Sequence, residues 1–424
     1  MIQDKPASPG AEPAPQGKWM ALLAAFLGWM FDGMEMGLFP LAGRPALREL
    51  LAARTDPSEL EPLVQAWFGW IIAAFLVGAA AGGILFGWMG DRIGRVKAMI
   101  WSVLTYSVFS GLCALAAAPW QIGVLRFIAA LGMGGEWSLG VALVMEIWPA
   151  QSRPILAGLI GAAANVGFLL AGLLGLLVPS AEGGWRTIFL IGAAPALLTF
   201  FIRIFVPESE RWKHAAATAP KTRVSEIFAP GIAGRTLLGA CLAGLALVGT
   251  WGSVQWIPNW TGQFTGGRAG AAEWAQNALA VGAILFTILA ALLAEKYNRR
   301  LAYFLLCLTS LAACQYLFRV RPEYGGFFLL LTFLVGGLTA AFYGWLPLYL
   351  PELFPTRVRA TGAGFAFNIG RILGAVGAVT GGELVKRVFD GDVARMCSWV
   401  TLVYAVGMVL IWLCPETKGR PLPE

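Results

Sequence analysis

The chain has 424 residues, of which 58% are hydrophobic and only 13% are charged, and its mean hydropathy is +0.69. Soluble domains carry about 25% charged residues, so this composition excludes a soluble globular protein and indicates an integral membrane protein. The formal net charge of +7 suits the anionic lipid of a cytoplasmic membrane surface, and we do not expect nucleic acid as a partner. The single histidine, His214, lies in a polar stretch. A proton carrier inside the membrane must therefore be a carboxylate.

Apolar runs long enough to cross a bilayer as helices follow one another along the chain. Residues 1–17 are rich in Pro, Ala and Gly and predict a disordered cytoplasmic tail. Six runs lie within residues 18–206, a polar and basic linker occupies 207–235, six more runs lie within 236–414, and 415–424 form a second tail. The predicted fold is therefore all-α, with twelve transmembrane helices in two six-helix bundles.

Between the first two runs, residues 43–63 are polar and predict a short surface helix. Lys and Arg are more frequent on the inside than on the outside if the amino terminus lies inside. We therefore expect both termini and the linker to face the cytoplasm, in a plasma or inner membrane. We expect a monomer, although no feature of the sequence indicates the oligomeric state.

A charged stretch, GWMGDRIGRVK, joins the second and third runs at residues 87–97. Gly87 and Gly94 permit a tight turn and a close approach of two helix ends. Asp91 can pair with a basic group or cap the amino end of a neighbouring helix. A short cytoplasmic loop with positive-inside charges, as any polytopic membrane protein has, is the simpler alternative. The order G-x-x-x-D-R-x-G-R-x-K is much more specific than such a loop requires.

The two halves carry matching motifs. The fourth run ends in MEIWPAQSR and the tenth in PELFPTRVR, both of which read E-x-x-P-x-x-x-R. The loop after the eighth run, AEKYNRR, resembles the charged stretch at similar offsets. These matches predict parallel repeats about an axis normal to the membrane. We expect the charged residues to form a cytoplasmic gate rather than to touch cargo: Gly87, Asp91, Arg92, Gly94, Arg95, Glu146, Arg153, Glu295, Arg299, Glu352 and Arg359.

Four charged residues within the spans are candidates for proton coupling. Asp32 and Glu35 lie three residues apart in the first run, on one helix face. Arg126 enters the fourth run from the opposite side to a similar depth, so it can pair with either carboxylate. We interpret Asp32, more than Glu35, as a proton carrier tuned by Arg126. The alternative is a permanent ion pair that fixes helix packing. Glu136 is either a second proton site or a brace for the inner loops.

Arg371 lies near the middle of the eleventh run and has no acidic neighbour on its own helix before Glu383. A guanidinium in this position suits a carboxylate substrate, which it can hold in a bidentate fork. The alternative is a pair with Asp32 or Glu35 in the empty state. Asn368, one turn earlier, can add a hydrogen bond.

The stretch TWGSVQWIPNW supplies candidate cavity residues in a helix that Pro258 interrupts: Trp251, Gln255 and Trp256. The sequence shows no nucleophile with a base, no metal-ligand cluster and no phosphate-binding loop with its Lys. We therefore expect neither an enzyme nor a metal or cofactor, but a proton gradient as the energy source.

Several motifs resemble those of the major facilitator superfamily: GWMGDRIGRVK, the R-x-x-x-x-x-G-x-G-G-E pattern from Arg126 to Glu136, the two E-x-x-P-x-x-x-R ends, and PETKG at 415–419. PETKG is similar to sugar porters. FDGME resembles the D-G-x-D of aromatic acid/proton symporters, and VRATGAGFAFNIGR resembles their helix 11 and that of sialic acid transporters, where the Arg371 position is tied to anionic substrates.

The resemblance implies a secondary active transporter that alternates access by rocking two bundles, with proton-coupled symport of a small organic anion. Its partners would be that small molecule and the lipid bilayer. A sugar or neutral polyol porter of the same superfamily is one alternative. A non-transporting membrane receptor or scaffold is another, although a scaffold needs neither gate motif.

Overall fold

The computed structural model describes residues 15–52, 55–177, 184–218, 222–266, 268, 270–372, 375, 385 and 387–424. Residues 1–14 of the predicted amino-terminal tail lie outside this part. The next three positions, 15–17, already belong to the first helix.

The amino-terminal bundle contains six spans. The sixth is divided in two by a 3₁₀ turn at Ala194–Leu197. Its helices are α1 (Pro15–Ala52), α2 (Pro57–Ile93), α3 (Arg95–Leu112), α4 (Pro119–Ile147), α5 (Arg153–Leu177), α6 (Gly184–Ile191) and α7 (Leu198–Phe205). A short helix, α8 (Glu210–Thr218), follows in the linker.

The carboxy-terminal bundle begins with a span that breaks at a 3₁₀ turn just before Pro258, because proline removes a backbone donor. Its helices are α9 (Ala233–Gly252), α10 (Ile257–Phe264), α11 (Ala271–Lys296), α12 (Arg299–Val320), α13 (Gly326–Ala340), α14 (Phe342–Leu353), α15 (Arg359–Asn368), α17 (Val393–Val400) and α18 (Val403–Leu410). Ten described spans are long and apolar enough to cross a membrane. With α6–α7 and α15 they make up the predicted twelve-helix fold.

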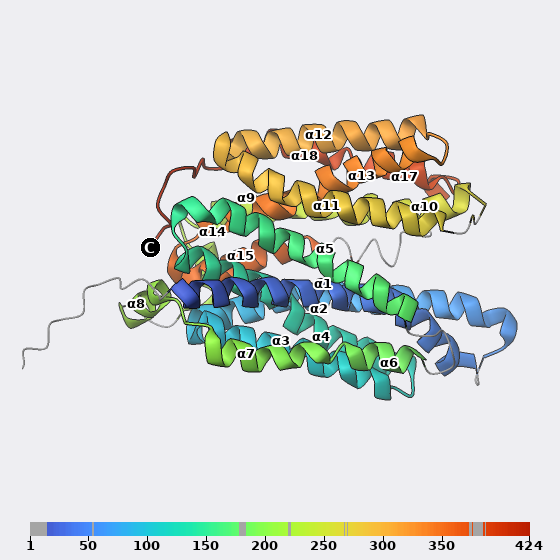
Figure 1. The fold of residues 1–424 in the computed structure, drawn as a ribbon, viewed down its shortest axis with the longest axis horizontal. Coiled ribbons are helices and arrows are strands. Elements are labelled where there is room, and N and C mark those ends of the chain that lie inside the picture. The colour runs from blue at the N-terminus through green and yellow to red at the C-terminus, as the bar shows by residue number, and fades with distance from the viewer. Residues whose placement is uncertain are drawn as a thin grey trace, which may run out of the picture.

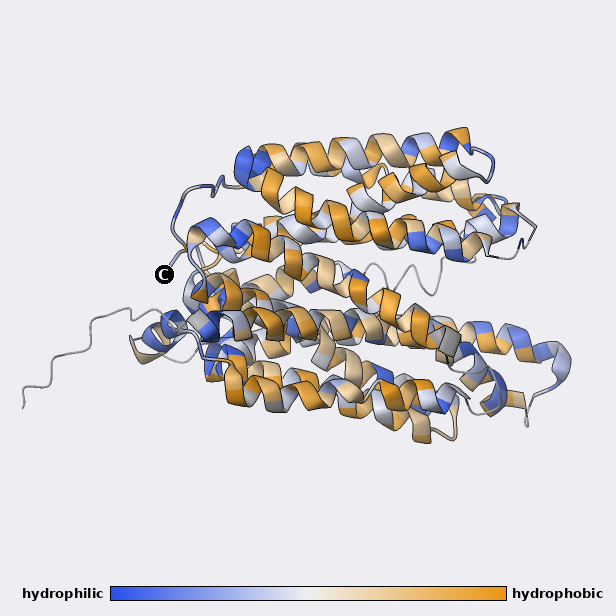
Figure 2. Ribbon diagram, in the orientation of Figure 1, coloured by the Kyte–Doolittle hydropathy of each residue, from blue (hydrophilic) through white to orange (hydrophobic). Residues whose placement is uncertain are grey.

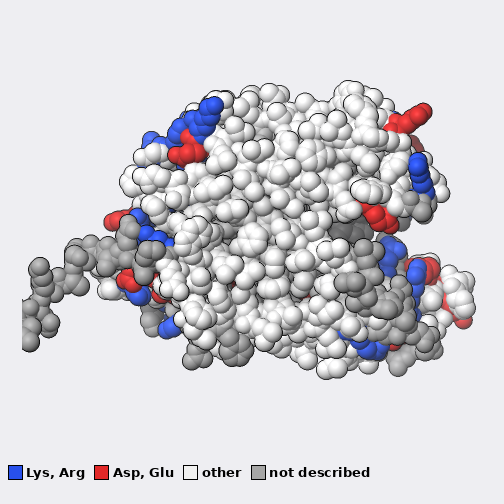
Figure 3. Space-filling model, viewed as in Figure 1, with Lys and Arg blue, Asp and Glu red and all other residues white. Residues whose placement is uncertain are grey.

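The helices run side by side along the long axis of the molecule in two groups (Figure 1). Helices α5, α14 and α15 lie between the groups, and α8 lies at the same end as the carboxy terminus and the start of α1. Apolar residues cover the helices along their length (Figure 2), and the charged side chains gather at the two ends (Figure 3). This distribution fits a band of lipid around the middle.

Close helix packing depends on small residues. This is expected in a membrane, because moving an apolar side chain from lipid to a helix interface contributes little to helix association. A Cβ at Gly82 of α2 would lie 2.0 Å from the Leu131 carbonyl of α4, and a Cβ at Gly134 of α4 would lie 2.0 Å from the Ala79 carbonyl of α2. Glycine at both positions lets the two backbones touch.

The prediction of a separate surface helix in residues 43–63 is wrong. Helix α1 instead continues through Pro40 and Pro45 to Ala52, and α2 begins at Pro57. The two spanning helices themselves therefore take up most of residues 43–63. The apolar side chains of Leu47 and Leu51 join the same core cluster as Leu38. Packing of this apolar stripe outweighs the helix-breaking effect of the prolines.

Candidate functional site

At one end of the molecule, the Arg95 side chain is completely buried at the start of α3. Its Nη1 donates to Oδ1 of Asp91 and to the Gly90 carbonyl, both at 2.7 Å. Its Nη2 donates to Oε1 of Glu146 at 2.9 Å and to the Thr356 carbonyl at 2.7 Å. We call Asp91, Arg95, Glu146 and Glu208 the N-terminal ion-pair cluster, and this end of the molecule the ion-pair end.

The N-terminal cluster joins the two halves of the molecule. Asp91 accepts hydrogen bonds from the backbone N–H groups of Ala360 (3.1 Å) and Thr361 (2.8 Å) and from the Thr361 hydroxyl (2.5 Å). It therefore caps the first turn of α15, where a negative charge is favoured by the helix dipole. Glu146 completes the link, because its Oε1 also accepts from Nη1 of Arg359 at 2.8 Å.

The second half repeats this geometry around Arg299. Its Nη1 donates to Glu295 (3.1 Å) and to the Ala294 carbonyl (2.9 Å), while Nη2 and Nε donate to the two oxygens of Glu352 at 2.9 and 3.1 Å. We call Glu295, Arg299, Glu352 and Glu416 the C-terminal ion-pair cluster. The side chain of Glu295 is 47% exposed, whereas that of Asp91 is buried.

Within each E-x-x-P-x-x-x-R motif, the acid and the base do not pair with each other. Glu146 pairs with Arg95 and Arg359, and Glu352 pairs with Arg299. Among the described residues Arg153 has no ion pair and its Nε has no hydrogen-bond partner. In each motif the proline ends the helix that carries the glutamate. The arginine then begins the next helix, so the two side chains lie on different helices.

The other predicted gate residues shape this end of the molecule. Gly94 has φ +109°, a conformation that side chains rarely adopt. A Cβ at Gly87 would lie 2.6 Å from the Ala360 carbonyl, so this glycine lets α2 approach α15. The Arg92 guanidinium lies over the Trp88 ring, 5.0 Å from its centroid.

Sequence reasoning missed two glutamates that complete the clusters. Glu208 accepts from the backbone N–H groups of Arg95 and Val96, both at 3.1 Å. Glu416 accepts in the same way from Arg299 and Arg300, both at 3.1 Å. The signal was present as the repeated tripeptides PES at 207–209 and PET at 415–417.

These two carboxylates differ electrostatically. Burial raises the pKa of Glu208, and the N–H groups of Ser209 and Val96 only partly oppose it. Burial also opposes ionisation of Glu416, but hydrogen bonds from the backbone of Lys418, Arg300 and Arg299 hold its pKa below its ordinary value.

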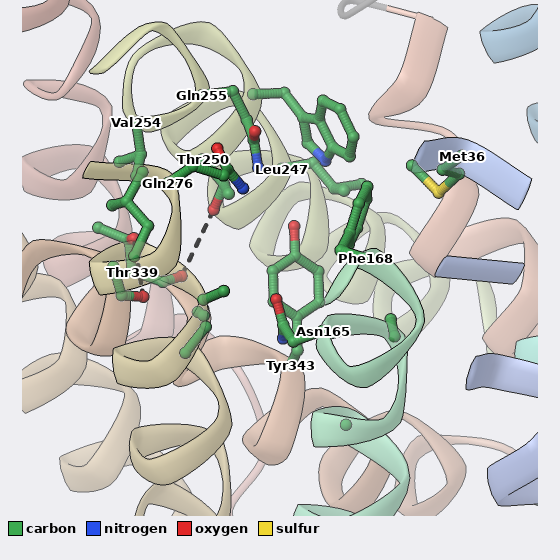
Figure 4. Close-up of a pocket in the computed structure, with 18 of the residues that line it drawn as sticks. Met36, Asn165, Phe168, Leu247, Thr250, Val254, Gln255, Gln276, Thr339 and Tyr343 are labelled. Atoms are coloured by element: carbon green, nitrogen blue, oxygen red, sulfur yellow. Dashed lines mark hydrogen bonds between the residues drawn. The ribbon is translucent and has the colours of Figure 1, made fainter. Parts of the chain in front are cut away.

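A cavity lies between the two halves, at the level of the helix breaks (Figure 4). Among the described residues that line it, Arg371 is the only charged one. Its Nη1 has no hydrogen-bond partner in the described part of the chain, and its guanidinium lies 5.9 Å from the centroid of the Phe367 ring. The other principal lining residues are neutral and polar or aromatic: Trp29, Asn165, Phe168, Thr250, Trp251, Gln255, Gln276, Thr339 and Tyr343.

The cavity contains three of the five predicted substrate residues. Arg371, Trp251 and Gln255 line it, whereas Asn368 and Trp256 do not. Asn368 is fully buried and its Nδ2 donates to the Gly134 and Gly364 carbonyls, both at 2.9 Å. It therefore ties α15 to α4. The amides of Asn165 and Gln276 were missed, although polar residues inside apolar runs are a recognisable signal.

Arg126 pairs with Glu35 rather than with Asp32. The Ser110 hydroxyl contacts both Glu35 oxygens, at 2.8 and 2.7 Å. The Arg126 guanidinium also lies 5.0 Å from the centroid of the Phe39 ring and 4.5 Å from that of the Phe75 ring. This arrangement satisfies a buried charge from several sides.

Asp32 and Glu136 are buried without such support. None of their four carboxyl oxygens has a hydrogen-bond partner among the described residues. Among the described residues, the charges that act most on Asp32 are those of Glu136, Arg371 and Glu35, and Arg371 is the cation of the three. Buried carboxyl groups that lack partners are costly, which marks both residues as functional candidates.

Comparison with known proteins identifies the relatives of the chain. A sequence profile described as Major Facilitator Superfamily matches residues 19–378. A "putative metabolite transport protein" of Haemophilus influenzae is 30% identical over 95% of this chain and 98% of its own length. The "cis,cis-muconate transport protein" of Acinetobacter baylyi is 30% identical over 87% of both chains. A solved structure of the proton:xylose symporter XylE superimposes with a TM-score of 0.77 at 19% identity, over 96% of this chain and 98% of that chain.

Proposed function

Because this chain belongs to the major facilitator superfamily, and is therefore a transporter rather than an enzyme or a scaffold, we propose that it moves a small organic anion together with a proton. The observation that carries the proposal is the single cation, Arg371, in a cavity whose other described lining residues are neutral. Its Nη1 has no partner among the described residues, and a guanidinium can bind a carboxylate in a bidentate fork. The name of the muconate-transporting relative supports an anionic cargo.

Coupling to a proton follows from the neighbours of Asp32. Among the described residues, Arg371 is the cation that acts on this buried carboxyl group, while Glu136 and Glu35 repel its charge. When a cargo carboxylate neutralises Arg371, Asp32 loses its compensation and takes up a proton. Cargo and proton then bind cooperatively, because each favours the other. This assigns the coupling role to Asp32 and Arg371, with the Glu35–Arg126 pair as a fixed support.

The ion-pair clusters fit the role of a gate. The N-terminal cluster links α2 and α4 to α15 across the two halves. We place this end on the cytoplasmic side of the membrane, together with both termini, and infer that the links break when the two bundles rock to release cargo. No contact of this kind requires a second subunit, and we expect a monomer.

Uptake into proteoliposomes tests the proposal. The panel contains benzoate, lactate, cis,cis-muconate, N-acetylneuraminate and glucose, with the outside acidic and with or without a protonophore. We expect protonophore-sensitive uptake of an acid, lost in Arg371→Gln and Asp32→Asn. Arg371→Lys is the matched control that keeps the charge but not the bidentate fork, and it should retain part of the activity.

A sugar or neutral polyol porter is the second candidate. The observation in its favour is the set of side-chain amides around the cavity, Asn165, Gln255 and Gln276 (Figure 4), since such groups hydrogen-bond hydroxyls. Glucose uptake that persists in Arg371→Gln would establish this alternative and overturn the organic-anion proposal.

A further inference from the structure

Two of the side chains that line the cargo cavity carry a hydrogen-bond donor without an acceptor. They are Trp29 of α1, in the amino-terminal bundle, and Arg371, just past the end of α15 in the carboxy-terminal bundle. The two residues are 5% and 6% exposed. Neither Nε1 of Trp29 nor Nη1 of Arg371 has a hydrogen-bond partner among the described residues. Buried polar atoms are normally paired, so two unpaired donors at one cavity require an explanation.

Both groups can donate a hydrogen bond, but neither can accept one. The indole nitrogen of tryptophan and the guanidinium nitrogens of arginine are donors only. The amides and hydroxyls that line the same cavity, such as those of Asn165, Gln255 and Tyr343, can donate or accept. A ligand group that satisfies both Trp29 and Arg371 must therefore be an acceptor, and a group with two acceptor oxygens can serve both donors at once.

The ring of Phe367, which also lines the cavity, lies next to both donors. The Trp29 ring meets it edge to face, with the centroids 5.9 Å apart and the planes at 71°. The Arg371 guanidinium lies 5.9 Å from the same centroid. Trp137 of α4 stacks on this ring at 3.8 Å and so holds it in place from the amino-terminal bundle. The two donors therefore approach one ring from opposite bundles.

Trp29 does not use the carboxyl group that lies nearest to it along the chain. Asp32 follows Trp29 by three residues on α1, about one helical turn. Neither oxygen of this carboxyl group has a partner among the described residues, and the indole N–H nevertheless remains unpaired. The simpler alternative is a tryptophan that only packs against Phe367, in which case the N–H group has no role.

We propose that the indole N–H of Trp29 is a second anchor for the cargo carboxylate. One carboxylate oxygen accepts from Trp29 and the other from Nη1 of Arg371, so the carboxylate bridges the two bundles. Hydrogen bonds to a charged acceptor are stronger than those to a neutral one, so this pair of donors selects a carboxylate over a neutral group of the same shape. The inference rests on the proposed transport of an organic anion and adds a residue that distinguishes the acid from its neutral analogues.

The test compares acids with their neutral analogues. The probes are benzoate, lactate, cis,cis-muconate and N-acetylneuraminate, each paired with its carboxamide (the diamide for muconate). Binding to the purified transporter is measured by isothermal titration calorimetry. In Trp29→Phe, which keeps an aromatic ring but removes the donor, we expect the Kd of the acid that the wild type binds most tightly to rise about tenfold. The Kd of its carboxamide should rise by about threefold at most, because the lost hydrogen bond joins neutral groups.

A second variant at the same position keeps the shape of the side chain. Trp29→benzothienylalanine replaces the indole N–H by sulfur and preserves the fused rings, so it should weaken acid binding as Trp29→Phe does. Trp137→Phe is the matched control. The Trp137 indole is also buried without an acceptor in the described part and contacts the same Phe367 ring, but it is not among the described residues that line the cavity. This control should leave both Kd values within about twofold of wild type.

Two results would overturn the role of Trp29. One is an acid Kd that stays at the wild-type value in both Trp29 variants while Arg371→Gln loses acid binding, in which case the organic-anion proposal stands without this anchor. The other is an equal weakening of acid and carboxamide in Trp29→benzothienylalanine, which indicates a packing role alone. If the wild type binds none of the four acids, the organic-anion proposal itself is refuted, and this inference falls with it.

Discussion

The two ion-pair clusters have the same design but different surroundings. In each, an arginine at the start of a helix binds an acid four residues earlier, a backbone carbonyl and a distant glutamate. Asp91 of the N-terminal cluster also caps α15 of the opposite half, whereas Glu295 is half exposed and its described ion pair stays within its own half. The same motif therefore connects the two halves in the N-terminal cluster, whereas in the C-terminal cluster it stabilises contacts within one half.

The largest expected effect comes from Asp91→Ala. The change leaves Arg95 and the first turn of α15 without their shared acceptor, and removing one partner of a buried ion pair costs about 3–5 kcal/mol. We expect transport to fall at least about tenfold and amide exchange at Ala360 and Thr361 to accelerate, as hydrogen-exchange mass spectrometry can show. Unchanged exchange would mean that the cap does not hold α15.

The second test compares Glu146→Gln with Glu352→Gln. Glu146 bridges Arg95 and Arg359 across the halves, while Glu352 binds Arg299 and Thr417 within one half. The Glu146 change should lower the melting temperature in detergent more, by a difference corresponding to about 2 kcal/mol. Equal losses would show that the cross-half pair contributes no more than the local one.

The third test uses pH. Glu416 has a lowered pKa, so its carboxylate stabilises the fold above the ordinary pKa, and this stability is lost as the pH falls through the folded value. Glu208 has a raised pKa, so its contribution is present at low pH and is lost as the pH rises through the folded value.

Melting temperatures of the glutamine variants between about pH 3 and pH 7 check these signs, because the Glu416 contribution is lost below the ordinary pKa of a glutamate. The deficit of Glu416→Gln should shrink toward acid pH, and that of Glu208→Gln should grow. Parallel curves for the two variants would contradict the assignment.

The smallest effect is expected for Glu295→Gln, because this side chain is 47% exposed. Exposed ion pairs contribute about 0–1 kcal/mol, and solvent screens the remaining charge. Melting temperature and transport should stay close to wild type at ordinary salt. A loss of stability or transport comparable to that of Asp91→Ala would show that the C-terminal cluster contributes as much as the N-terminal cluster.

The sequence predicted the parts of the molecule that depend on hydropathy and on local motifs. Long apolar runs determine the twelve spans, and the E-x-x-P-x-x-x-R repeat correctly indicated two related halves. The sequence did not predict which charges pair. Asp32 and Glu35 are only three residues apart, and one turn of α1 decides that Glu35, not Asp32, meets Arg126.

The same limit applies to the cavity. Asn368 ends α15 and Arg371 follows it by only three residues, yet the Asn368 side chain donates to the Gly134 carbonyl of α4 and Arg371 lines the cavity. Helix rotation and partner choice depend on the assembled bundle, which spacing along the chain does not encode. The roles assigned to these residues in binding and coupling remain predictions.

The carbonyl of Pro423 accepts hydrogen bonds from Arg359 Nη2 at 2.7 Å, from the Thr356 N–H at 3.2 Å and from the Thr356 hydroxyl at 3.3 Å. The same Arg359 binds Glu146 across the halves. For protein engineering, this means that a fluorescent or affinity fusion attached after Glu424 would begin one residue from a carbonyl that contacts the ion-pair end. An amino-terminal fusion leaves that carbonyl untouched and is the sounder choice for measuring native turnover.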